Sequence, residues 1–455
     1  MIRLNNRIIY VLIFFVTLIL YYPSLNSYFV NDDYNWIKEI SFYEVISSFW
    51  GGWGHGALYR PLTRLLLYFE FLLFDKNPAG YHIVSIFLHS TVLFLAFRIA
   101  RLIFISRETG YSVLILSLFF FPFHEAVCWI SSQTIILGSV FVSLSLFCFI
   151  NYILKKNSRY YYYSLAFCLL SLLSYESSIA LPALCFISFF MFNEFNFKSI
   201  KKIIALLIPF IILSAVYLIY RKIVLSGLPE ANELTADITR WFLNYAAFLN
   251  HQINKNTPVL ILFVISLAGI FLLKKSQWKY ILFSLSWVFI TYLPFSIIGG
   301  YTGRFAYYSL FGIIFFISYM LIVLTGKYTG LKIPVIILIS AYCLINIYKT
   351  NENARNWYEA GEIARGIPLQ LKNLHPAFPE NSTLIFYDIP AEYSHSGVFL
   401  TYFEDVIQSN YPVKINIIKE TFPGNNDLKK EDHGNKEKVF RFRYYLRERV
   451  LKELN

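Results

Sequence analysis

The chain has 455 residues, of which 57% are hydrophobic and only 15% are charged, and its mean hydropathy is +0.52. A soluble globular domain carries about 25% charged residues, so this composition excludes an ordinary soluble protein and indicates a chain that lies in lipid. The formal net charge of +12 would suit a nucleic-acid-binding protein, but the distribution of the basic residues described below predicts contact with membrane lipids and no nucleic acid.

A helix that crosses a membrane needs about 20 mostly apolar residues. About eleven segments of the chain meet or approach this requirement: 8–25, 81–103, 111–123, 132–154, 160–175, 178–192, 202–225, 258–273, 280–298, 305–325 and 333–348. Arg3 and Arg7 precede the first segment, and no small-residue cleavage site follows it, so it is expected to stay as an anchor. The predicted fold class is therefore an α-helical polytopic membrane protein with about 11 transmembrane helices, residues 1–351.

Lysine and arginine residues concentrate in alternate loops, namely 98–107, 155–159, 198–202, 274–279 and 327–332. Basic loops remain on the cytoplasmic side of a membrane, so the pattern predicts a cytoplasmic N-terminus and an outer C-terminus. The five cysteines all lie in or beside apolar segments and have no metal-type spacing. Their scarcity favours a multi-pass protein of a bacterial inner (plasma) membrane.

The apolar segments stop at residue 351. Residues 382–388 and 413–418 have the composition of strands, and residues 354–374 and 398–410 that of helices. We therefore expect a small extracytoplasmic α/β domain over residues 352–455. Its charged end, residues 427–455, is predicted to be a solvated helix or to be partly disordered.

The first outer loop, residues 26–80, carries the adjacent carboxylates Asp32 and Asp33. Acidic side chains near hydrocarbon are costly and mark functional sites in membrane proteins. Two neighbouring like charges raise the pKa of one of them, which suits a group that accepts a proton near neutral pH. The alternative is that Asp33 caps a short helix from Tyr34 to Ile40 and that Asp32 faces water.

Three arginines lie at the outer ends of apolar segments. Arg60 and Arg304 either extend to the lipid headgroups or bind a lipid phosphate. Arg221 is more informative because the preference of basic residues for the cytoplasmic side disfavours its position, so an anionic partner is expected there.

Two further acidic positions stand between apolar segments on the same side. His124 and Glu125 precede Trp129, and Glu176 lies in a tight turn. They either face solvent in their loops or act as supporting acids that position an acceptor. His124 and Glu125 do not form a zinc-protease motif, because the position of its second histidine is Cys128.

The spacing of these motifs resembles a known family. The segments that carry the likeness are 31–33 (NDD), 59–63 (YRPLT), 77–82 (NPAGYH), 123–131 (FHEAVCWIS), 171–182 (SLLSYESSIALP) and 303–308 (GRFAYY). Together they are similar to the multispan GT-C glycosyltransferases that use lipid-linked sugars, and most of all to the membrane part of TMTC-type protein O-mannosyltransferases and their bacterial relatives. Two departures stand out: Gly303 replaces a usual Glu before the arginine, and no 34-residue tetratricopeptide period follows residue 351.

The resemblance implies a GT-C fold and an inverting transfer of a monosaccharide from a polyprenyl-phosphate carrier to a glycan, lipid or protein hydroxyl on the outer face. In that family the first-loop acids supply the base, so Asp32 or Asp33 would be catalytic, and Asp32 is favoured. No metal or other cofactor is expected. The remaining roles follow by likeness: Arg60, Arg304 and Arg221 would hold the donor phosphate, His124, Glu125 and Glu176 would support the acceptor, and Tyr34, Tyr59 and Trp129 would line the substrate groove.

Three other functions remain open. An envelope oligosaccharide ligase or polymerase would use a diphosphate-linked donor and is expected to have a large outer loop between later spans. A flippase or transporter of lipid-linked sugars would show paired halves with a charged site at the bilayer midplane, whereas here the acids gather on the outer side. A non-enzymatic membrane scaffold would give no reason for Asp32, Asp33 and the arginines.

Overall fold

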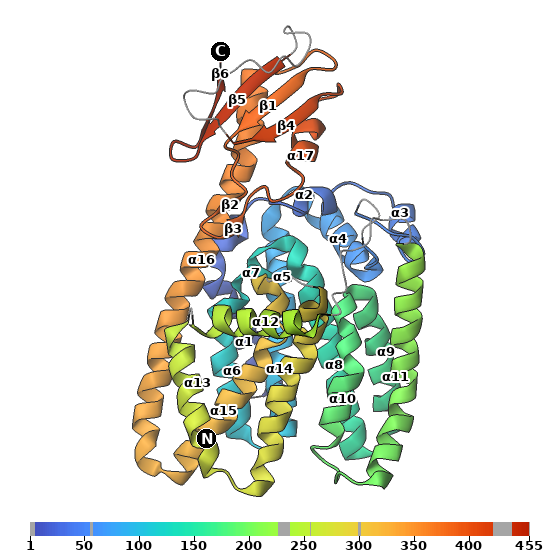
Figure 1. The fold of residues 1–455 in the computed structure, drawn as a ribbon, viewed down its shortest axis with the longest axis vertical. Coiled ribbons are helices and arrows are strands. Elements are labelled where there is room, and N and C mark those ends of the chain that lie inside the picture. The colour runs from blue at the N-terminus through green and yellow to red at the C-terminus, as the bar shows by residue number, and fades with distance from the viewer. Residues whose placement is uncertain are drawn as a thin grey trace.

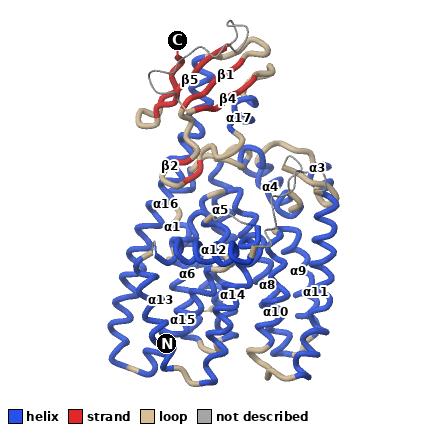
Figure 2. Tube along the Cα trace, viewed as in Figure 1, coloured by secondary structure: helices blue, strands red, loops and turns tan. Residues whose placement is uncertain are grey.

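The computed structural model describes residues 5–54, 58–225, 237–254, 256–298, 302–421 and 439–454. Long helices stand side by side in a bundle, and a small sheet-containing domain lies beyond one end of it (Figure 1). Figure 2 shows that the strands gather in this end domain, whereas the bundle is helical. The predicted class, a polytopic helical protein with a small C-terminal α/β part, is confirmed.

The α-helices of the bundle and its outer loops are α1 (Asn6–Leu20), α2 (Asp33–Trp36), α3 (Phe42–Ser47), α4 (Pro61–Phe74), α5 (Pro78–Ile103), α6 (Arg107–Leu118), α7 (His124–Cys128), α8 (Gln133–Lys155), α9 (Ser158–Ser174), α10 (Leu181–Phe189), α11 (Phe197–Val224), α12 (Ile238–Leu249), α13 (Thr257–Gly269), α14 (Trp278–Ile298), α15 (Leu310–Lys327) and α16 (Lys332–Leu374). Three short 3-10 turns matter for the site: η3 (Ile130–Ser132), η4 (Glu176–Ala180) and η8 (Gly303–Ala306).

Each of the predicted apolar segments corresponds to a helix, but not every helix has the length of a span. By length and composition, six helices of the described chain could cross a membrane, or up to eight if each of two bent pairs is one span. The shorter elements explain the difference from about eleven. Helix α1 has 15 residues, and α6 has 12 and meets the next helical segment at an angle of 60°.

Polar residues at the loop ends set where several helices begin. The side chains of Asn77, Ser106, Asn157 and Asn196 each accept a hydrogen bond from a backbone N–H in the first turn of the helix that follows. Such caps satisfy N–H groups that have no partner inside the helix. The turns between α13 and α14 and between α15 and α16 lie at the end of the bundle opposite the sheet domain (Figure 1). These turns belong to the basic loops, so the two ends differ in charge; which end faces the cytoplasm stays a prediction.

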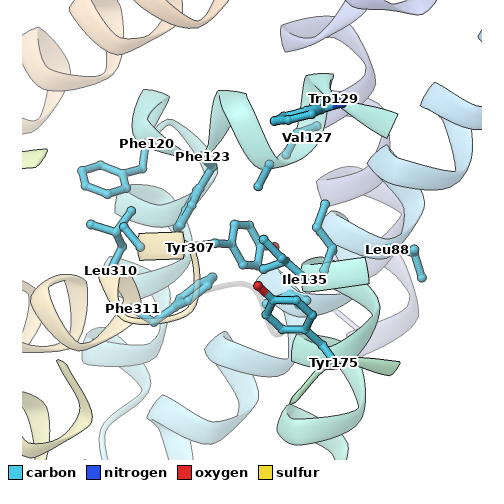
Figure 3. Close-up of a cluster of buried hydrophobic side chains, with 14 of the residues drawn as sticks. Leu88, Phe120, Phe123, Val127, Trp129, Ile135, Tyr175, Tyr307, Leu310 and Phe311 are labelled. Atoms are coloured by element: carbon cyan, nitrogen blue, oxygen red, sulfur yellow. The ribbon is translucent and has the colours of Figure 1, made fainter. Parts of the chain in front are cut away.

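The centre of the bundle is packed with aromatic side chains (Figure 3). The rings of Phe123, Tyr307 and Phe311 lie against one another, with centroid separations of 5.1 to 6.1 Å. His89 of α5 is fully enclosed by this group, and its Nδ1 lies 2.7 Å from the hydroxyl of Tyr307. A buried histidine with a hydroxyl partner joins α5 to the start of α15 and leaves no need for a metal there.

The C-terminal domain holds a four-stranded sheet in the order β4-β1-β5-β6. Its strands are β1 (Thr383–Tyr387), β4 (Asn416–Glu420), β5 (Val439–Tyr445) and β6 (Val450–Leu454); a two-residue pair, β2 (Glu392–Tyr393) and β3 (Ser396–Gly397), and α17 (Phe403–Ser409) complete the domain. Strand β1 is parallel to β4 and β5, and β6 is antiparallel to β5. The expected strand over 382–388 and the expected helices are present, while the strand expected over 413–418 begins three residues later.

The prediction for residues 427–455 was wrong where the structure describes them. Instead of a solvated helix, residues 439–445 and 450–454 form β5 and β6. In β5 the side chains of Phe442 and Tyr444 are buried and alternate with arginines. This alternation with period two is typical of a strand with one covered face. Residues 427–438 and Asn455 lie outside the described residues.

Helix α16 joins the two parts of the molecule. It runs without a break for 43 residues from the far end of the bundle to the base of the sheet (Figure 1), so the expected domain boundary at residue 351 lies inside it. Gly361 on this helix lies against the first outer loop: a Cβ there would overlap the backbone nitrogen of Tyr28. Next to this contact, the hydroxyl of Ser27 donates a hydrogen bond to the carbonyl of Trp357 at 2.7 Å.

We expect Gly361→Ala to destabilise the protein because the added methyl would push the first outer loop away from α16. Gly366→Ala is the matched control: its Cβ would meet only the side chain of Gln370 at 3.6 Å, an ordinary contact. Alanine is favoured over glycine inside a helix by about 1 kcal/mol, so the control should hold or raise stability. The measurement is the thermal unfolding midpoint in detergent. Equal midpoints for the two variants would contradict the close contact.

Candidate active site

A cavity of about 560 Å³ lies at the end of the bundle that faces the C-terminal domain. Its polar lining includes Asp32, Arg60, Glu176, Arg221 and Arg304. These five come from five different parts of the chain and all were predicted as site residues. Aromatic and aliphatic side chains complete the wall: Trp36, Leu58, Trp129, Ile135, Tyr175, Ile179, Leu218, Phe295, Ile297 and Phe305. A cavity with an apolar wall and a few charged groups is typical of a site for a small or amphiphilic ligand.

The adjacent carboxylates Asp32 and Asp33 lie in different surroundings. Asp32 lines the cavity and accepts a hydrogen bond from the hydroxyl of Thr401 at 3.0 Å. Asp33 is only 1% exposed and points away into the protein. Its carboxylate accepts hydrogen bonds from the backbone and hydroxyl of Ser131 at 2.8 and 2.5 Å and from the backbone of Val30 at 3.1 Å. The structure thus separates the pair: Asp32 can contact a ligand, and Asp33 fastens the loop to η3.

Burial raises the pKa of Asp33 to about 7, although the hydrogen bonds from Ser131 and Val30 lower it, and the neighbouring Asp32 raises it further. The buried carboxyl therefore binds a proton more readily in the folded protein than in the unfolded chain, where an aspartate titrates near pH 4.

Arg60 makes close contacts with Glu176 and Tyr175 in the cavity wall. Nε and Nη2 of Arg60 donate to the two carboxylate oxygens of Glu176 at 2.8 and 2.6 Å. The same guanidinium lies over the ring of Tyr175, 4.5 Å from its centre. Burial alone would raise the pKa of Glu176, but Arg60 and Arg221 outweigh it and hold the pKa at about 2. Glu176 is therefore ionised, and the guanidinium of Arg60 is already paired with this carboxylate.

Arg221 makes a much looser contact with the same acid. Its Nη2 lies 3.9 Å from Oε1 of Glu176, and about 29% of its side chain is exposed. It projects from the last turns of α11 into the cavity wall beside Leu218. The anionic partner predicted for this residue is present as Glu176, but one carboxylate is shared by two guanidinium groups. The pair Arg60 and Arg221 thus leaves an excess positive charge at this wall.

Arg304 holds the other side of the cavity. Its Nη1 lies 3.4 Å from Oε1 of Glu125, and its guanidinium stacks over Trp129 with 4.0 Å to the ring centre. Trp129 in turn stacks on Trp357 of α16. A Cβ on Gly303 would overlap Oε2 of Glu125. Any larger side chain at residue 303 would therefore require the Glu125 carboxylate to move from the place where it contacts Arg304.

Besides Asp33 and Glu125, three more predicted site residues are not part of the cavity lining. Nδ1 of His124 contacts the carbonyl of Phe121 at 3.0 Å, and its ring stacks on Phe121. Tyr34 stacks on Phe399 of the C-terminal domain. Tyr59 is 5% exposed, and its hydroxyl donates to the carbonyl of Phe49 at 3.0 Å. These side chains support the loops that carry the site, whereas Trp129 is part of the wall.

Several lining residues carry no sequence signal of a site. Tyr175, Trp36 and Phe295 read as ordinary membrane or interfacial aromatics, and Ser131 as a loop serine. Their positions in the sequence give no sign that they lie near the charged residues in the folded protein. Within the residues that the structure describes, no three or more His, Cys, Asp or Glu side chains gather as a metal-binding group.

The comparisons with known proteins agree with the chemistry of this cavity. Residues 59–220, just over a third of the chain, match the family described as dolichyl-phosphate-mannose-protein mannosyltransferase. This segment includes Arg60, Glu125, Trp129 and Glu176. The match agrees with the predicted resemblance for this segment and supports the predicted enzyme class, a membrane glycosyltransferase.

Two solved structures align with most of the chain. One is ArnT from Cupriavidus metallidurans bound to undecaprenyl phosphate, with 11% identity and a TM-score of 0.47, covering 89% of this chain and 85% of that one. Another is the oligosaccharyltransferase of Archaeoglobus fulgidus in the apo form, with 12% identity and a TM-score of 0.46, covering 84% of this chain and 62% of that one. Alignments at these scores are too weak to carry a conclusion by themselves. No curated relative matches the chain in sequence.

The buried state of Asp33 predicts a pH dependence of stability. Because its pKa is raised to about 7 in the folded protein and is near 4 in the unfolded chain, the native state binds more protons between these values. The contribution of Asp33 to stability is therefore fully present below about pH 4 and is lost as pH rises through 7. We expect the unfolding midpoint of the wild type, relative to that of Asp33→Asn, to fall between pH 4.5 and 7.5. Parallel midpoint curves for the two proteins would contradict a raised pKa.

Proposed function

We propose that the protein is an inverting glycosyltransferase that moves a monosaccharide from a polyprenyl-phosphate carrier to an acceptor hydroxyl on the outer face of the membrane. The observation that carries the proposal is the cavity in which Asp32 stands with Arg60, Arg221 and Arg304. A carboxylate and three guanidinium groups in one largely apolar cavity match the two needs of this reaction: a proton acceptor and cationic groups for a phosphate.

Asp32 acts as the base in this mechanism. The acceptor hydroxyl gives its proton to the Asp32 carboxylate while its oxygen forms a bond to the anomeric carbon of the donor. The bond from that carbon to the phosphate oxygen breaks, and its electron pair leaves with the polyprenyl phosphate. Attack from the face opposite the leaving group inverts the anomeric centre. Asp33 has no direct part, because its carboxylate is enclosed by Ser131 and Val30.

The arginines bind the phosphate of the leaving group, whose negative charge grows as the sugar departs. Arg221 is the principal donor to this phosphate, since it is the least engaged of the three. Arg60 and Arg304 keep their carboxylate partners and make the electrostatic potential at the cavity wall more positive. Leu218, Pro294 and Ile297 give the same cavity an apolar side, which suits the first isoprene units of the carrier.

The comparison supports a donor of this kind. The matched family is described by a dolichyl-phosphate-mannose donor and a protein acceptor, so a lipid monophosphate sugar is the first donor to test. The match ends before Arg221 and begins after Asp32. An outward-facing site is a further part of the proposal, supported by the alternation of basic loops. The bacterial inner-membrane location is also proposed, on the low use of cysteine.

We expect Asp32→Asn to lower transfer by about 100- to 10,000-fold to a small residual rate, because the amide cannot accept the proton of the acceptor hydroxyl. The assay follows radiolabelled sugar from undecaprenyl-phosphate mannose, glucose or N-acetylhexosamine in proteoliposomes that contain a membrane extract as the source of glycan, lipid and protein acceptors. Asp33→Asn is the matched control and should keep turnover per folded molecule. The same reactions are run with and without EDTA, because the proposal assigns the stabilisation of the leaving group to arginines.

Full turnover by Asp32→Asn would overturn the role of Asp32. Transfer from an undecaprenyl-diphosphate oligosaccharide but from none of the monophosphate donors would identify the ligase or polymerase function instead. Loss of wild-type transfer in EDTA, with recovery on addition of a divalent metal, would overturn the metal-free part of the mechanism.

Arg221→Gln should raise KM for the donor more than it lowers kcat, because a charged hydrogen bond to the phosphate contributes about 1.5 to 3 kcal/mol, or roughly 10- to 100-fold in binding. Lys222→Gln removes the same charge from the neighbouring residue, which lies outside the cavity lining, and should keep the wild-type KM. An unchanged KM in Arg221→Gln would show that this residue does not bind the donor phosphate.

A further inference from the structure

One segment of the C-terminal domain lies directly on the loop that carries Asp32. We call residues 396–402 the strap; it begins in β3 and ends at the start of α17. In Figure 1 the segment between β3 and α17 passes at the level of α2, and hydrogen bonds join it to the first outer loop. The two segments are more than 360 positions apart in sequence, so their contact is made by the fold alone.

Backbone and side-chain contacts join the strap to the first outer loop at consecutive residues. The backbone N–H of Asn31 donates to the carbonyl of Val398 at 3.1 Å, and its side-chain oxygen accepts from the N–H of Leu400 at 2.6 Å. Tyr34 stacks on Phe399. Asn31 is fully buried and adopts a left-handed conformation with a φ of 47°, which asparagine tolerates better than most residues. The loop is therefore fixed on both sides of Asp32.

The last contact reaches the proposed base itself. The hydroxyl of Thr401 donates to Oδ1 of Asp32 at 3.0 Å, and Asp32 lies in the cavity wall. Asp33 is held by Ser131 on the bundle side, whereas the hydrogen bond to the Asp32 carboxylate comes from the C-terminal domain. One carboxylate oxygen is held by Thr401 and the other is left for the acceptor hydroxyl.

We propose that the C-terminal domain is part of the catalytic apparatus: its strap holds Asp32 in the orientation for proton transfer, and Thr401 is the positioning residue. This inference rests on the proposed function, in which Asp32 is the base. The Asp32 carboxylate makes no capping hydrogen bond to the helix that follows it, so Thr401 is what fixes its orientation at the cavity edge. A misplacement of about 1 Å of a catalytic group lowers the rate by as much as about 100-fold.

Thr401→Val tests the proposal, because valine keeps the shape of threonine but removes the hydroxyl. We expect kcat to fall roughly 10-fold or more, within the range for a misplaced group, with KM for the lipid donor unchanged, and Thr401→Ser to restore kcat. Thr383→Val makes the same change in β1 of the same domain, away from the strap, and should behave as the wild type. Turnover is normalised to folded protein, so a loss of stability alone does not register as a change in kcat.

Double substitution separates positioning from an independent structural effect. If Thr401 acts through Asp32, adding Thr401→Val to Asp32→Asn should not lower the residual rate further. Gly397→Ala provides a second approach, because its Cβ would overlap Nδ2 of Asn31 and shift the strap; it should lower kcat as Thr401→Val does.

Wild-type kcat in both Thr401→Val and Gly397→Ala, or an undiminished effect of Thr401→Val in the Asp32→Asn background, would overturn the positioning role. If Asp32→Asn shows the expected loss in the same assay, the proposed function survives that result. If Asp32→Asn turns over at the wild-type rate, the base assignment fails first and the positioning role fails with it.

Discussion

The bidentate contact between Arg60 and Glu176 is the interaction on which the site depends. It joins the start of α4 to the turn between α9 and α10, and both segments contribute to the cavity wall. Both side chains are mostly enclosed, with 13% and 22% exposed. An ion pair removed from water is stable only with good geometry, and loss of one partner leaves an uncompensated charge that costs about 3 to 5 kcal/mol. Neither residue can change without the other.

Because of this constraint, the three arginines of the cavity differ in how fully their charge is compensated. Because Glu176 already compensates Arg60, the guanidinium of Arg221 shares a carboxylate that is largely used and remains available to a ligand. Arg304 is balanced by Glu125 and by the face of Trp129. The cavity therefore keeps a net positive wall without an isolated buried charge. A lipid phosphate that enters this wall replaces water around one guanidinium and leaves the two structural pairs in place.

The sequence allowed much of this arrangement to be predicted. Apolar segments located the helices, because hydropathy is a property of consecutive residues. The charged lining residues were found because their charge conflicts with their place beside hydrocarbon. β5 was missed because the lysines and glutamates around it hid the alternation of Phe440, Phe442 and Tyr444 with arginines. The distinct roles of Asp32 and Asp33 could not be separated from sequence, since adjacent acids look alike until Ser131 and Thr401 are brought to them by tertiary folding.

The continuity of α16 explains why a small exterior domain can influence a site in the bundle. The helix begins at the opposite end of the bundle, contacts the first outer loop at Trp357 and Gly361, and leads into the sheet. Trp357 also stacks on Trp129, and the guanidinium of Arg304 lies over the ring of Trp129. One helix thus touches both the loop that bears Asp32 and the aromatic support of Arg304. The proposed base and the aromatic support of Arg304 are therefore positioned by the same helix. In the proposed function, the placement of the domain at the end of α16 would set the geometry for both proton transfer and phosphate binding.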